Sequence, residues 1–75
     1  MLALADAVDL DALRLRNEFL EMPGLVVNGS QVARLLGVGV LHAFELLDAL
    51  EREQFLIRLT NGAYRRAPLL REVRL

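Results

Sequence analysis

The chain has 75 residues, no cysteine and a formal net charge of −1, and 55% of its residues are hydrophobic. A chain of this length makes one domain with a small core, since it buries only about 60% of the surface that its unfolded form exposes. The lack of cysteine excludes disulfide cross-links and zinc sites built on thiolates, and it fits a cytoplasmic protein. The hydrophobic fraction exceeds the ~45–50% of ordinary domains, so we expect association with a protein partner or a second copy.

The sequence predicts no membrane segment and no signal peptide. The longest run of apolar residues and glycine, Leu35–Leu41, is far shorter than the ~20 residues that cross a bilayer. The first five residues are followed by Asp6 and contain no lysine or arginine, unlike the start of a signal peptide. We therefore expect a cytoplasmic protein that has no membrane partner.

The charges are unevenly distributed along the chain. Residues 1–51 hold three arginines and eight acidic residues, a net charge of −5, whereas residues 52–75 hold six arginines and two acidic residues, a net charge of +4. Every cationic residue is an arginine, which can bind phosphate through two parallel hydrogen bonds. The pattern indicates a basic C-terminal third suited to nucleic acid, although codon bias in a GC-rich genome explains the arginines equally well.

A first helix is expected from about Asp9 to Met22, with Asp6 or Asp9 as its N-cap and with Pro23-Gly24 ending it. Its apolar residues form two stripes at helical spacing. The first stripe contains Val8, Ala12, Leu15, Phe19 and Met22, and the second contains Leu10, Leu13 and Leu20. Either the helix packs against both later helices at once, or the second stripe pairs with another subunit.

The second predicted helix begins with a capping box and ends at a glycine. Residues 25–27 form a short β-prone run, which is followed by Asn28 as the N-cap and by Gln31 three residues later. The helix continues to Leu36, and Gly37 suits the left-handed conformation that ends many helices. We expect an inward face of Val32, Ala33, Leu35 and Leu36.

A third helix is predicted from about Val40 to Glu53, directly after Gly37-Val38-Gly39. Its expected buried stripe contains Val40, Ala43, Leu46, Leu47 and Leu50, with Phe44 at the edge. Its expected outward face contains Leu41, His42, Glu45, Asp48, Ala49 and Arg52.

A β-hairpin is predicted after the third helix. Phe55–Leu59 and Ala63–Arg66 are β-prone, and Asn61-Gly62 between them predicts a type I′ turn with positive φ at both residues. Helix, tight turn, helix and two-stranded ribbon is the order of elements in a winged helix-turn-helix. We therefore expect an α+β fold of three helices with a small two- or three-stranded β wing, forming a single winged-helix domain over residues 1–75, with a core at about 9–66 and a tail at 67–75.

Several segments resemble small bacterial winged helix-turn-helix proteins, and together they cover about residues 10–66. The segments are Glu18–Leu25, Gln31–Gly37, Leu47–Leu50, Phe55-Leu56 and Asn61–Arg66. The resemblance implies a transcription-regulator-like module, or a winged helix that docks on proteins. It also implies a Ser, Thr or Asp cap near Gly39 and a polar or basic third helix, and this chain departs from both patterns.

The residues do not favour an enzyme, a metal site or a cofactor. His42 is the only histidine, and we expect it to be ordinary surface. Ser30 has no base near it in the sequence. Gly37-Val38-Gly39 follows a helix rather than a strand and lacks a third glycine, so it is not a phosphate-binding loop.

Two functional hypotheses remain. In the first, the third helix enters the major groove of double-stranded DNA and the wing contacts phosphates or the minor groove. The residues assigned to DNA are Ser30, Arg34, Leu41, His42, Glu45, Arg52, Arg58, Asn61, Arg65 and Arg66. In the second, the chain docks on a protein or forms a homodimer. The residues assigned to that interface are Leu10, Leu13, Leu20, Leu41 and Phe44.

Overall fold

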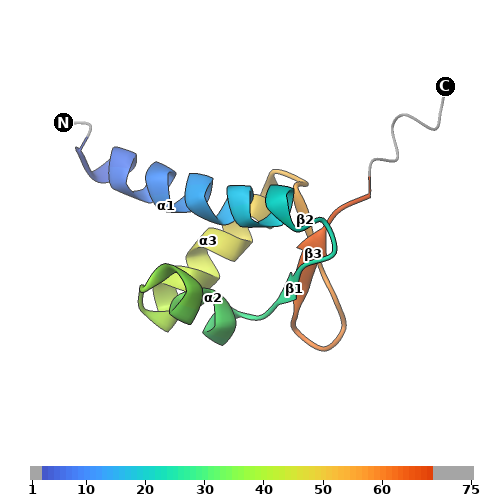
Figure 1. Ribbon diagram of the computed structural model, residues 1–75. Helices are drawn as coiled ribbons and strands as arrows, with labels where there is room; N and C mark the ends of the chain where they lie inside the picture. The colour runs from blue at the N-terminus through green and yellow to red at the C-terminus, as the bar shows by residue number, and fades with distance from the viewer. Residues whose placement is uncertain (1–2, 69–75) are drawn as a thin grey trace, which may run out of the picture.

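The computed structural model describes residues 3–68, with side chains from Leu10 onward. The elements in chain order are α1 (Ala3–Glu21), β1 (Val26–Val27), α2 (Gly29–Leu36), α3 (Val40–Arg52), β2 (Leu56–Arg58) and β3 (Tyr64–Arg66). Figure 1 shows α1 lying across α3, with the sheet beside the C-terminal half of α1. The predicted α+β fold of three helices and a small sheet is confirmed, and its layout is consistent with a winged helix. Over the described residues, no helix is long and apolar enough to cross a membrane.

The first helix is longer than predicted. It begins at Ala3, so Asp6 and Asp9 lie inside the helix and the predicted start at Asp9 was wrong. Residues 3–8 contain no glycine or proline and include three alanines and one leucine, which are strong helix formers, so the helix extends past both aspartates. The helix ends at Glu21, just before Pro23-Gly24, close to the predicted end.

The middle of one apolar stripe of α1 is buried in the domain, while Val8 of that stripe lies outside the described side chains. Leu15 and Phe19 are fully buried, and Ala12 packs at the edge of the core. Met22 was assigned to this stripe but is exposed, because the helix ends one residue before it. The second stripe faces solvent along its whole length, so the interpretation that α2 and α3 use both stripes is wrong.

The capping box of α2 forms as predicted. The Asn28 side chain accepts from the Gln31 backbone N–H at 2.9 Å, and the Gln31 side chain accepts from the Asn28 N–H at 2.8 Å. Gly37 ends the helix with φ of 71°. Leu35 was expected to face inward but is exposed. At about 100° per residue, Leu35 lies about 100° from Leu36 and just outside the arc of buried residues, beyond its edge at Val32.

The third helix buries four of its five predicted core residues: Ala43, Leu46, Leu47 and Leu50. Val40 is exposed, contrary to the prediction, because it is the first residue of the helix and lies one turn before the covered part of that face. Gly39 precedes the helix in an extended conformation and supplies no side-chain cap.

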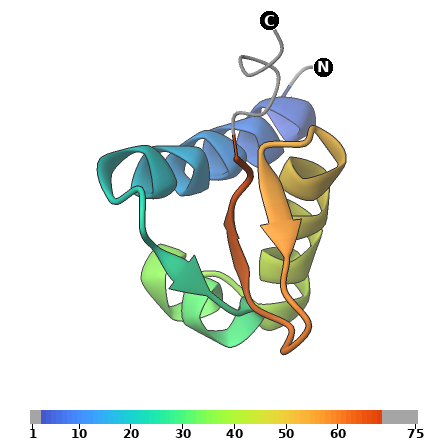
Figure 2. The same cartoon turned by 90° about the vertical axis from the view of Figure 1, so that its right-hand side faces the viewer.

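The three strands form an antiparallel sheet in the order β1-β3-β2, which Figure 2 shows from its exposed side. The β2–β3 hairpin has a different turn from the one predicted. Gly62 has φ of 88°, but Asn61 does not have positive φ. The Leu59 carbonyl accepts from Gly62 N–H at 3.0 Å, and Leu59 N–H donates to the Ala63 carbonyl at 2.7 Å. The loop therefore has three residues and ends in a left-handed glycine, so the type I′ prediction was wrong.

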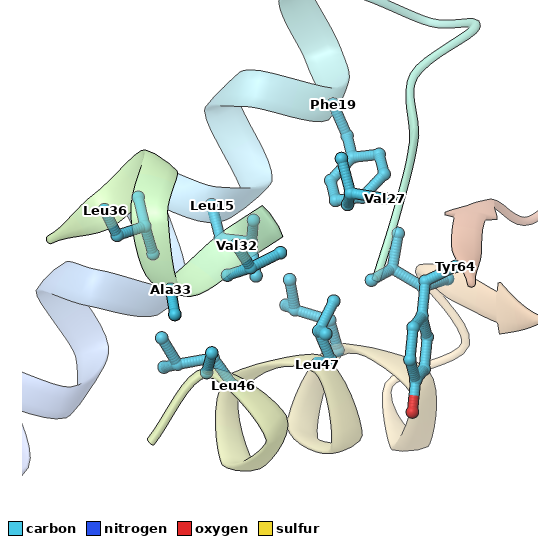
Figure 3. Close-up of a cluster of buried hydrophobic side chains, with 12 residues drawn as sticks. Leu15, Phe19, Val27, Val32, Ala33, Leu36, Leu46, Leu47 and Tyr64 are labelled. Atoms are coloured by element: carbon cyan, nitrogen blue, oxygen red, sulfur yellow. The ribbon is translucent and has the colours of Figure 1, made fainter. Parts of the chain in front are cut away.

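The core lies where the three helices meet the inner face of the sheet. Figure 3 shows Leu15 and Phe19 of α1 facing Val32 of α2, Leu47 of α3 and Tyr64 of β3. Phe55 packs beside this cluster, and its ring meets that of Phe19 edge to face at 6.4 Å between centroids. Packing in the core leaves the outer face of α3 uncovered, together with the outer face of the hairpin that follows it.

Candidate nucleic-acid and protein contact surfaces

The outer face of α3 is open to solvent. Leu41 is 80% exposed, and Glu45, Asp48 and Arg52 are exposed along the same helix. This face offers an apolar side chain and two carboxylates near its start and middle, and a single arginine at its end. It has little positive charge with which to attract phosphate.

His42 joins α3 to α1 and is not ordinary surface. Its Nε2 lies 3.0 Å from Oδ2 of Asp11 on α1, and its Nδ1 lies 3.3 Å from Oε1 of Glu45. These hydrogen bonds to Asp11 and Glu45 raise the pKa of His42 above its ordinary value of 6.5. The histidine therefore favours its charged form, in which both ring nitrogens donate to carboxylates.

Asp11 is the centre of this network, and no sequence signal singled it out. Arg14 donates to Asp11 at 3.3 Å and to the Leu36 carbonyl at the end of α2 at 3.4 Å. The network thus connects all three helices. Because the DNA hypothesis assigned His42 to base contacts, this geometry changes its role: the ring is held against α1.

The predicted backbone contacts on α2 are exposed and share one face. Ser30 and Arg34 are four residues apart, so they lie one above the other on the helix surface. Arg34 is in the last turn of α2. Both side chains are free to meet a ligand that lies against α2.

The arginines of the hairpin do not form one cluster. Arg58 lies opposite Tyr64 in the register, while Arg65 lies opposite Ile57. Residues directly opposite each other share a face and successive residues alternate, so Arg58 and Arg65 point to opposite faces of the hairpin. Both are exposed, and Arg58 lies 4.0 Å from Glu51 of α3.

Arg66 and Asn61 have structural roles rather than free side chains. The Arg66 guanidinium lies over the Phe55 ring at 4.4 Å, and Arg16 of α1 lies 4.9 Å from the same ring. Such contacts between a cation and an aromatic ring hold Arg66 against the core. Asn61 Oδ1 accepts from the Ala63 N–H at 3.0 Å and thereby closes the turn. Arg58 and Arg65 therefore carry the available charge of the wing.

The residues assigned to a protein interface lie on two exposed apolar surfaces. Leu41 and Phe44 lie one turn apart on α3, where Phe44 is partly exposed and its ring covers the start of α2. Gly29 is required for this contact, since a Cβ atom there would lie 2.5 Å from Phe44 Cζ. On α1, Leu10, Leu13 and Leu20 are 62%, 51% and 50% exposed.

The described residues contain no pocket and no group of three or more potential metal ligands. No protein-family model, curated protein or solved structure matches the chain. Its function is therefore argued from the surfaces described above.

Proposed function

We propose that the protein is a DNA-binding winged helix-turn-helix module of the kind found in transcription regulators. The observation that supports the proposal is the uncovered outer face of α3 beside a hairpin that carries one exposed arginine on each face. Arg65 lies on the outer face of the hairpin. Arg58, by contrast, lies on the face of the buried Tyr64 and beside Glu51 of α3. The hairpin therefore offers phosphate one cation on its outer face and one next to α3.

In this proposal α3 enters the major groove and α2 lies over the backbone. Leu41 meets a thymine methyl group, and Glu45 accepts from a cytosine amino group, a contact that carboxylates make in the major groove. Ser30 and Arg34 contact phosphate. Since Glu45 and Asp48 repel phosphate, most of the affinity comes from Arg58 and Arg65 of the wing, with Arg34 and Arg52 adding to it.

The test is a mobility shift on mixed-sequence duplex DNA at low salt. We expect Arg65→Ala and Arg58→Ala each to weaken binding across all sequences and to reduce the slope of log affinity against log salt by about 1. The control is Arg14→Ala, which makes the same substitution on α1 at a residue that bonds Asp11 and the Leu36 carbonyl and is not assigned to DNA. No shift of wild-type protein at tens of micromolar would contradict the proposal, as would equal losses in all three variants.

A second candidate function is protein docking through α3, as a homodimer contact or as an accessory subunit of a larger complex. The specific observation is Leu41, the most exposed large apolar side chain among the described residues, next to the partly exposed Phe44. Exposed apolar patches on small domains commonly mark contact surfaces. If α3 docks on protein, then Leu41→Ser abolishes the association while wild-type protein fails to shift DNA. For the homodimer form of this candidate, sedimentation at rising concentration should show a dimer that Leu41→Ser abolishes.

A further inference from the structure

The exposed face of α1 carries a regular apolar seam. Leu10, Leu13, Asn17 and Leu20 are spaced by three, four and three residues, the spacing of the a and d positions of a heptad repeat. All four residues are exposed. At about 100° per residue, this seam points away from Leu15 and Phe19, so the domain itself leaves it without a partner.

We propose that this seam pairs with the same seam of a second copy of this chain, as a short parallel two-stranded coiled coil. The spacing assigns Leu10 and Asn17 to a positions and Leu13 and Leu20 to d positions. One asparagine at an a position specifies the register and the number of strands. The two-fold axis then runs alongside the two α1 helices.

Asn17 determines whether the two α1 helices pair in parallel or antiparallel. In a parallel pair each a residue faces its own equivalent, so the two Asn17 amides face each other and can hydrogen-bond. In an antiparallel pair with the same layers, Asn17 faces Leu13 of the second copy. That arrangement buries an amide with no hydrogen-bond partner, which is unfavourable.

The charges beside the seam favour the same orientation. Arg14 and Arg16 flank the seam at e and g positions. In the antiparallel pair the two Arg14 residues face each other, and so do the two Arg16 residues. In the parallel pair, Arg16 lies beside Glu21 of the second copy, since g pairs with the e position five residues later. Arg16 already bonds Glu53 at 2.7 Å, yet a third of its side chain stays exposed.

The seam spans little more than one heptad, but each helix is already formed before it associates. Leu15 and Phe19 anchor α1 to its own core, so pairing does not bear the nucleation cost that makes short isolated helices unstable. The seam lies on the far side of α1 from the core, and α3 and the wing stay uncovered in the dimer. The proposed dimer therefore does not depend on the proposal that the protein binds DNA.

Sedimentation of the full chain at rising concentration tests the dimer. We expect wild-type protein to approach twice the monomer mass and Leu13→Glu to stay monomeric with unchanged helix content by circular dichroism. The matched control is Leu35→Glu, since Leu35 is a similarly exposed leucine on α2 outside the seam, and this variant should still dimerise. A wild-type monomer at every concentration overturns the proposal, and so does a dimer that Leu13→Glu leaves intact.

Cysteine cross-linking tests the orientation, because the chain has no cysteine of its own. We expect Leu20→Cys alone to form a disulfide-linked dimer under mild oxidation, since this variant keeps Asn17 and only the parallel pair brings the two copies of position 20 together. Leu35→Cys is the control for random collision and should cross-link far more slowly. Cross-linking in a mixture of Leu10→Cys and Leu20→Cys, with none in Leu20→Cys alone, would overturn the parallel arrangement.

Discussion

His42 shows how a single side chain can couple two helices through charge. Asp11 on α1 and Glu45 on α3 lie against its two ring nitrogens, and Arg14 competes for Asp11. The carboxylates favour the imidazolium, so the folded protein holds the proton more tightly than the unfolded chain does. The contact between the N-terminal part of α3 and α1 is thus linked to pH.

We expect this linkage to appear as a pH-dependent stability. Because the folded pKa of His42 is raised, its contribution is fully present below the unfolded value near 6.5 and is lost as pH rises through the folded pKa. Urea unfolding across this range should show wild-type stability falling relative to His42→Gln. In an Asp11→Asn background the difference in stability between proteins with His42 and with His42→Gln should be smaller, because the Asp11 hydrogen bond is the largest cause of the raised pKa of His42. Identical pH profiles for wild type and His42→Gln would show that the network has no energetic effect.

At the scale of elements, the two helices of the helix-turn-helix differ in how they begin. The side chains of Asn28 and Gln31 each satisfy a backbone N–H at the start of α2. Gly39 offers α3 no side-chain acceptor. The difference leaves α3 with more unsatisfied N–H groups at the end that bears Leu41, and α3 is held in place there by tertiary contacts, including the His42 bond to Asp11.

Substitutions at Asn28 and Gly39 should therefore change the free energy of unfolding in opposite directions. Asn28→Ala is expected to cost about 0.5–2 kcal/mol of unfolding free energy, because it removes a hydrogen-bonded N-cap. Gly39→Ser should stabilise by a few tenths of a kcal/mol, since an N-cap serine replaces glycine. Gly39 has φ of −69°, and a Cβ atom there meets nothing within 4 Å, so serine fits. Urea denaturation of both variants measures the effects, and a destabilised Gly39→Ser would contradict the prediction.

At the scale of the whole molecule, a small core supports a large exposed apolar surface. The fully buried side chains include Leu15, Phe19, Leu47 and Tyr64, while nine large apolar residues remain exposed between Leu10 and Phe44. A domain of this size is stable by only about 0.05–0.15 kcal/mol per residue. Each core side chain therefore accounts for a substantial share of the stability, and the exposed apolar residues are free to serve association.

Two leucines of α3 distinguish packing in the core from contact at the surface. Leu47→Ala should cost about 2–5 kcal/mol, because Leu47 is fully buried and its truncation leaves a cavity. Leu41→Ser should change the unfolding free energy by no more than about 0.5 kcal/mol, because Leu41 is a surface residue. Thermal and urea unfolding of both variants checks this. A large loss of stability in Leu41→Ser would place Leu41 in the core and remove it from the candidate contact surfaces.

The sequence by itself determined the order of the elements and most of the core. The capping box at Asn28, the helix ends at Pro23-Gly24 and Gly37, and the buried stripe of α3 all follow from local hydrogen bonding or helical period. These signals lie within a few residues of one another, so they do not depend on the rest of the fold. The predicted start of α1 was wrong. Asp6 and Asp9 are plausible N-caps, but the segment around them is strongly helical and the helix continues through both.

The tertiary structure alone decided which surfaces are available. Periodicity shows two apolar stripes on α1, but only packing against α2 and α3 selects the one that is buried. The His42 bond to Asp11 joins residues 31 positions apart, and the stacking of Arg66 on Phe55 depends on the register of the hairpin. Such contacts depend on the angles and registers at which the elements pack, and these are set by the whole core rather than by neighbours in the chain.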